Sequence, residues 1–183
     1  MAGTITRRRF VETALMSAAL SAAAVWLGPG LGRTRAAIAA DPGRKFFTPA
    51  EEVTIAAACA RIIPGSPAEP GATEVGVARV IDFLCARTPT LRPLYRGGAA
   101  GLDEAARALH GKPFATLPPA RQDEVLSAVQ AGKAAGTAWR QIPSPVFFNV
   151  LQLHTKAAYY TDPASFRFTG YPGPYDHTRR KHG

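Results

Sequence analysis

The chain has 183 residues, of which 46% are hydrophobic, and a formal net charge of +9. Residues 1–39 hold five of the 22 Lys and Arg residues and one of the 13 Asp and Glu residues, so the other 144 residues carry 17 minus 12, or +5. This length suits one domain with a modest core, and the lack of a basic helix face interleaved with aromatic residues argues against nucleic-acid binding.

The N-terminal segment, residues 1–39, has the layout of a secretory signal peptide, with a basic start, an apolar run of about 14 residues and a small-residue end. Arg7 and Arg8, with Phe10 two residues after the pair, are similar to the twin-arginine consensus, which directs folded proteins to the bacterial periplasm. The apolar run is shorter than the roughly 20 residues that span a bilayer. We therefore expect cleavage just before Ala40 rather than an uncleaved membrane anchor.

The next part of the chain begins a helix with clear signals. Thr48 can cap the helix, Pro49 fits its first position, and Glu51 completes a Thr-x-x-Glu capping box. Further apolar periodicity, bounded by Pro and Gly, predicts four more helices, and we expect Pro89 and Pro93 to interrupt the chain after the second helix. The five expected helices cover residues 49–63, 74–88, 97–110 (closed by Gly111), 118–132 and 144–160. No strand pattern competes, so we predict a single small all-α bundle of about five helices.

The segment after residue 160, TDPASFRFTGYPGPYDHTRRKHG, is rich in Pro, Gly and aromatic residues and has no periodicity. We expect Asp162 to bind backbone amides and Pro163 to stop the preceding helix, followed by an extended tail. The predicted organisation is a signal peptide over residues 1–39, a helical domain over 40–175 and a basic flexible tail over 176–183.

Two cysteines, Cys59 and Cys85, lie on consecutive helices of this prediction. A disulfide is the natural suspicion in an oxidising compartment. In an antiparallel pair, however, the two positions are offset by roughly 10 Å along the helix axis. A disulfide needs Cα atoms about 4.4–6.8 Å apart. We therefore expect two buried free thiols.

Motifs for covalent haem, iron–sulfur clusters, dinucleotides and zinc proteases are missing from the sequence. His110 ends a helix, where a cation is favourable. His154 lies among aromatic residues, and we expect a buried, hydrogen-bonded histidine there. Two alternatives stay open: a stand-alone periplasmic cofactor- or metal-binding protein that uses His154 and nearby tyrosines, and an enzyme built around His154 and Asp162.

The last third of the chain is dense in aromatic residues. An irregular tail cannot bury all of them internally, which indicates a surface for a protein partner. The residues that we expect in this contact are Phe147, Phe148, Tyr159, Tyr160, Asp162, Tyr171 and Pro172.

The chain resembles the gluconate 2-dehydrogenase subunit 3 family in four stretches that occur in the same order. They are RIIPGSPAEPGATEVGVARVIDFL, PFATLPPARQDEVL, VFFNVLQLHTKAAYYTDP and GYPGP, and the similarity spans about residues 47–174. Many members carry a Gly-Gly-Asn stretch after Tyr-x-Asp-Pro, where this chain has ASFRFT. The chain therefore resembles a divergent branch.

This resemblance implies a non-catalytic small subunit without a cofactor of its own. Its partner would be a FAD-dependent large subunit of the glucose-methanol-choline type, which passes electrons from a sugar or alcohol to a c-type cytochrome subunit containing haem c. Large subunits of this kind commonly lack an export signal. The small subunit would then bind the flavoprotein, aid its folding and carry it through the twin-arginine translocase to the periplasm, where the complex can be membrane-associated.

Overall fold

The computed structural model describes residues 45–169. This part of the chain contains six α-helices, three short 3₁₀ helices and no strand, which confirms the all-α prediction. The α-helices are α3 (Pro49–Ile62), α4 (Val77–Arg87), α5 (Arg92–His110), α6 (Pro119–Gln130), α7 (Ser144–Tyr160) and α8 (Pro163–Thr169). The predicted export-signal residues Arg7, Arg8 and Phe10, the tail residues Tyr171 and Pro172, and the segment 176–183 lie outside the described residues.

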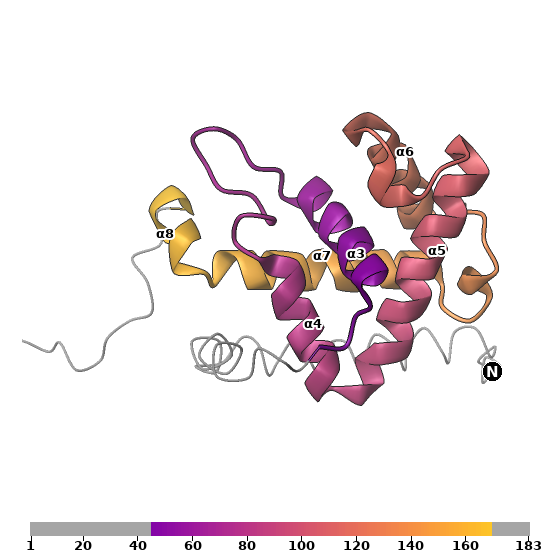
Figure 1. Ribbon diagram of the computed structural model, residues 1–183, viewed down its shortest axis with the longest axis horizontal. Coiled ribbons are helices and arrows are strands. Elements are labelled where there is room, and N and C mark those ends of the chain that lie inside the picture. Colours follow the sequence, from indigo (N-terminus) through magenta and orange to yellow (C-terminus); the bar gives the residue numbers. More distant parts are fainter. Residues whose placement is uncertain (1–44, 170–183) are drawn as a thin grey trace, which may run out of the picture.

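Helix α7 is the centre of the bundle. It runs along the length of the described domain, α3, α4 and α5 lie across it, α6 packs near its first half, and α8 adjoins its end (Figure 1). A helix that is apolar on most sides is expected to be surrounded in this way. Its buried residues are Ser144, Val146, Phe147, Phe148, Val150, Leu151, His154, Thr155, Ala158 and Tyr159.

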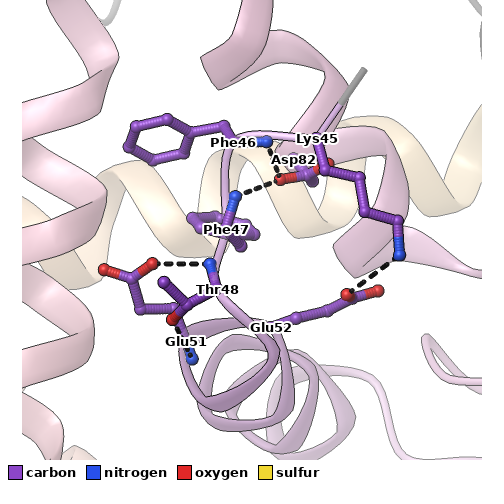
Figure 2. A network of polar contacts seen from close by, with 7 residues as sticks. All are labelled: Lys45, Phe46, Phe47, Thr48, Glu51, Glu52 and Asp82. Carbon is purple, nitrogen blue, oxygen red and sulfur yellow. Dashed lines mark hydrogen bonds and ion pairs between the residues drawn. The ribbon is translucent and has the colours of Figure 1, made fainter. Parts of the chain in front are cut away.

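The start of α3 has the predicted capping box. The Thr48 hydroxyl accepts from the Glu51 N–H at 3.3 Å, and the Glu51 carboxylate accepts from the Thr48 N–H at 2.8 Å (Figure 2). Just before the cap, one carboxylate oxygen of the buried Asp82 accepts from the N–H groups of Phe46 and Phe47, at 2.9 and 2.6 Å. These two bonds, the Asp82 tether, fix the beginning of the described chain to α4.

Helix α5 begins earlier than predicted, at Arg92 instead of residue 97, after the 3₁₀ helix Pro89–Leu91. We expected Pro93 to interrupt the structure, but it occupies the first turn, where its missing N–H has no helical partner to lose. Gly98 belongs to the extended first half, and a Cβ at this position would overlap the ring of Phe147. The predicted end is confirmed, because Gly111 is the left-handed cap with φ of 71°.

The prediction of an extended segment directly after α7 is wrong, because α8 occupies residues 163–169. Asp162 binds a backbone amide as expected, since its carboxylate accepts from the Ala164 N–H at 2.6 Å, and its carbonyl accepts from the Ser165 N–H at 2.9 Å. Ser165 in turn donates its hydroxyl to the Tyr159 carbonyl at 2.8 Å. Pro163 ends α7 and also starts the next helix, where its fixed φ is favourable.

Both cysteines are free and buried, which confirms that prediction. Burial raises the pKa of the Cys59 thiol to about 12, although a hydrogen bond from the Thr155 hydroxyl at 3.3 Å acts in the opposite direction. Burial, followed by the nearby Asp82 charge, also raises the pKa of Cys85 well above its ordinary value. Both groups are therefore protonated and unreactive in the folded chain at neutral pH.

Candidate partner-binding surface

His154 is a core residue of α7. Its side chain is fully buried, its ring stacks on Tyr95 with 5.9 Å between ring centroids, and its Nδ1 lies 2.8 Å from the Tyr95 hydroxyl. Burial lowers the pKa of His154 to about 4, so the imidazole is neutral at pH 7. The expectation of a buried, hydrogen-bonded histidine is confirmed. A substrate or an external ligand would reach this ring only if the core opened.

Asp162, the other residue of the alternative enzyme hypothesis, has a structural role and lies apart from His154. It is buried at the junction of α7 and α8, where its carboxylate caps α8. Asp162 lies beyond the end of α7 at Tyr160, and His154 lies six residues, or roughly 9 Å, before that end. Within residues 45–169, no three His, Cys, Asp or Glu side chains gather in a group that could hold a metal ion.

The first two residues of the predicted contact, Phe147 and Phe148, are also in the core. The Phe147 ring lies edge-on to Tyr95 with centroids 6.1 Å apart and contacts Trp139 at 5.8 Å. Aromatic pairs of this kind stabilise a core beyond the area that they bury. In the described structure these two residues hold α7 in the bundle and offer little surface to a partner.

The consecutive tyrosines at the end of α7 have different environments. Tyr159 is buried, and its hydroxyl donates to the carbonyl of Pro70 at 2.7 Å, which connects α7 to the loop after α3. Tyr160 is 51% exposed, and its ring packs against that of Tyr159 with 5.2 Å between centroids. Neighbouring residues of a helix point about 100° apart, so one ring faces inward and the other outward. Of the predicted contact residues that the structure describes, Tyr160 is the exposed one.

Tyr160 shares its face of α7 with a second exposed apolar residue. Leu153 lies seven residues earlier, two turns along the same face of α7, and is 39% exposed. The exposed Lys156 lies between them, and two phenylalanines of the adjoining α8, Phe166 and Phe168, are partly exposed. We call these five residues the α7–α8 surface. Leu153 was not among the predicted contact residues. Its position outside the buried stripe of α7 was the signal in the sequence that could have identified it.

Other exposed apolar side chains of the described residues stand on different helices. Val53 on α3 and Leu109 on α5 are both more than half exposed. Single apolar residues on a protein surface are common and need no special explanation. Leu153 and Tyr160, by contrast, are two exposed apolar side chains on the same face of one helix. The α7–α8 surface is therefore the better candidate for binding another protein.

These features define a small all-α domain. His154 and Asp162 have structural roles in it, and one of its helices exposes apolar side chains to solvent. The family model of gluconate 2-dehydrogenase subunit 3 matches residues 49–173, and the chain belongs to this family. The match confirms the resemblance found in the sequence, at nearly the same limits. No curated protein and no solved structure matches the chain. No helix of the described residues has both the length and the apolar character needed to cross a membrane.

Proposed function

We propose that this chain is a non-catalytic small subunit that binds a FAD-dependent sugar or alcohol dehydrogenase of the glucose-methanol-choline type. The observation that carries the proposal is the family match, which spans all described residues except the first four. The family is named for the third subunit of gluconate 2-dehydrogenase. In the proposed complex the flavoprotein holds FAD and oxidises the substrate, and a c-type cytochrome subunit containing haem c receives the electrons.

The proposed contact with the flavoprotein is the α7–α8 surface. Tyr residues supply large contact area at low cost in side-chain entropy, and they are enriched among the residues that dominate binding energy. Tyr160 has this character, since it is exposed while the buried Tyr159 supports its ring. Leu153 extends the apolar area along α7. The tail residues Tyr171 and Pro172 extend the same contact in this proposal.

The second part of the proposal is export. A twin-arginine signal with Arg7, Arg8 and Phe10 would serve a partner that must bind FAD and fold before it leaves the cytoplasm. The small subunit then aids folding of the flavoprotein and carries it through the twin-arginine translocase. The mature complex resides in the periplasm, where this chain can be membrane-associated through the complex.

Purification of the C-terminally tagged chain from its native host tests the proposal. We expect a larger protein to co-purify with a flavin absorption spectrum. Changing both Arg7→Lys and Arg8→Lys should leave both proteins in the cytoplasm. A lone chain without colour would contradict the proposal. A lone chain with its own absorption band would favour the alternative in which this protein itself binds a cofactor or metal.

The location of the contact needs a separate pair of variants. Leu153→Glu combined with Tyr160→Glu places two charges in the α7–α8 surface, and we expect the flavin to be lost from the purified complex. The matched control combines Val53→Glu with Leu109→Glu, which adds the same charge at exposed apolar residues elsewhere. Flavin retained in both variants would show that the partner binds another surface. Flavin lost from both would mean that charge or stability, and not location, decides the result.

A further inference from the structure

A basic hollow lies at the start of the described chain, on a part of the bundle that the proposed flavoprotein contact does not use. The hollow is open, has a volume of about 610 Å³, and forms where this segment meets the end of α4 and the first turns of α5. Figure 1 shows the start of the described chain beside α4 and near its connection to α5. The lining residues are Lys45, Phe46, Ala86, Arg87, Arg92 and Arg96.

The guanidinium groups of the three arginines of the hollow lie near aromatic rings. The Arg87 guanidinium lies 4.5 Å from the centroid of the Phe83 ring, and the guanidinium groups of Arg96 and Arg92 lie 4.9 and 5.8 Å from that of Phe46. Stacking occupies the flat face of a guanidinium and leaves the N–H groups of its edge available for hydrogen bonds. The donors of Arg87 and Arg96 can therefore reach a ligand, whereas those of Arg92 already bind the carbonyls of Cys85 and Ala86.

Positive charge exceeds negative charge around the hollow. Glu52 lies 3.6 Å from the Lys45 ammonium group, and Glu51 lies 3.8 Å from Nε of Arg96. These long ion pairs are weak, because the cation of each pair is more than half exposed. Figure 2 shows that Glu51 also accepts from the N–H of the α3 cap and that Asp82 faces the two N–H groups of its tether. Four exposed cations thus face two loosely paired carboxylates and one that is buried.

We propose that this hollow binds an acidic segment of a protein partner, with the carboxylates of Asp or Glu side chains accepting from Arg87 and Arg96. The planar fork of Arg matches the two oxygens of a carboxylate, and Arg and aromatic residues are enriched in protein interfaces. An open hollow with several cations suits a segment that carries more than one carboxylate.

A lipid surface fits the hollow less well than a peptide does. Peripheral membrane surfaces combine cations with apolar side chains that enter the bilayer interface. The large exposed apolar residues of the described chain are Val53, Leu109, Leu153 and Tyr160, and none of them lines the hollow. This inference goes beyond the proposed function, because it assigns a second contact surface and depends on neither the α7–α8 surface nor a flavin partner.

The test is a binding titration of the full-length chain with fluorescein-labelled hexaglutamate, followed by fluorescence anisotropy. The variant combines Arg87→Gln with Arg96→Gln. Arg92 stays unchanged, because its guanidinium also donates to the carbonyls of Cys85 and Ala86 at 2.9 and 2.7 Å and so holds the end of α4. The expected result is binding that saturates in the wild type and is weakened by about tenfold or more in the variant.

The matched control combines Arg121→Gln with Arg140→Gln. It removes the same charge from two exposed arginines outside the hollow, and it should weaken hexaglutamate binding less than about twofold. Equal losses in the two variants would overturn the proposal, because net charge alone would then explain the binding. No detectable binding to the wild type would also overturn it.

Two further probes separate the possible anions. Inorganic phosphate at millimolar concentration should leave most of the peptide bound, and vesicles of phosphatidylglycerol in phosphatidylcholine should bind no better than phosphatidylcholine alone. Displacement of the peptide by phosphate would contradict the peptide hypothesis and favour a phosphate ligand. Vesicle binding that needs Arg87 and Arg96 would contradict it in favour of a lipid surface. If the double Gln variant fails to fold, Arg87→Lys with Arg96→Lys keeps the charge but loses the fork. Binding of that variant should be several-fold weaker, and equality with the wild type would contradict recognition by guanidinium.

Discussion

Protonation of His154 should make the stability of this domain depend on pH between about 6.5 and 4. The imidazole is fully buried against Tyr95, and burial lowers its pKa to about 4 in the folded chain. In the unfolded chain the pKa returns to about 6.5. Between these values the unfolded state binds a proton that the folded state does not, so acid favours unfolding.

The size of this effect follows from the two pKa values. Stability should fall by about 1.4 kcal/mol for each pH unit between pH 6.5 and pH 4, about 3 kcal/mol in total, and this contribution should be constant below pH 4. Because the pKa of His154 is lower in the folded chain than in the unfolded chain, the folded state is most stable, with respect to this group, above pH 6.5. About 3 kcal/mol is a large part of the stability of a small domain.

Denaturant unfolding of the tagged chain at several pH values, followed by circular dichroism, measures this dependence. The comparison protein is His154→Gln, whose side-chain amide can donate to or accept from the Tyr95 hydroxyl but does not titrate. Carboxylates with lowered pKa values, such as Asp123 beside Arg61, contribute equally to both proteins at the acid end. The difference between the two curves therefore isolates His154.

We expect wild type to lose stability faster than His154→Gln as the pH falls from 6.5 to 4, whatever the offset between them at pH 7. Parallel curves over this range would refute the argument, because they would mean that the histidine titrates alike in both states. The same outcome would indicate that water reaches the imidazole in solution and that the core around Tyr95 is looser than the structure shows.

Three further predictions concern the framework. Asp82→Ala removes both bonds of the Asp82 tether and should cost about 2–4 kcal/mol in thermal unfolding, whereas Asp82→Asn, which keeps an acceptor oxygen, should cost about half as much. Gly98→Ala places a methyl group on the ring of Phe147 and should destabilise the chain by about 1–3 kcal/mol in denaturant unfolding. Cys59 and Cys85 should react with a thiol reagent only after unfolding, because both are buried and protonated.

Each of these predictions has a clear contrary outcome. Asp123→Ala breaks a half-exposed ion pair and should cost less than about 1 kcal/mol, so an Asp82→Ala variant no worse than this control would contradict the tether. Helix propensity alone would make Gly98→Ala stabilising by about 1 kcal/mol, and that sign would contradict the close approach of the ring. Rapid labelling of native thiols would place the cysteines at the surface.

Local signals in the sequence predict most of the helices, because caps and breaks are properties of a few neighbouring residues. The capping box at Thr48 and the glycine cap at Gly111 are both confirmed. The second predicted helix begins three residues late, at Val77, and the two larger errors concern proline. Pro93 and Pro163 were interpreted as breaks, and each lies in the first turn of a helix. Proline cannot donate an N–H in either position, so a single sequence does not distinguish the end of one helix from the start of the next.

The side chains that form the candidate surface are harder to predict. Aromatic residues are favoured in cores and in interfaces for the same reason, their large apolar area. The same short stretch of α7 therefore contains Phe147, which is in the core, and Tyr160, which is on the surface. Tertiary packing decides between them. The contact predicted for Tyr171 and Pro172 stays a prediction, since both lie outside the described residues.

The basic hollow has no counterpart in any local pattern. Its cations come from segments about 40 residues apart, and the Asp82 tether brings Lys45 and Phe46 to the end of α4.

The hollow and the α7–α8 surface use different helices, so their variants are independent measurements. Loss of the flavoprotein with hexaglutamate binding retained would assign the partner to α7 and α8, whereas the reverse result would assign the acidic ligand to another protein. Loss of both from a single pair of variants would indicate that this pair disturbs the fold, and a circular dichroism spectrum that matches the wild type would exclude that explanation.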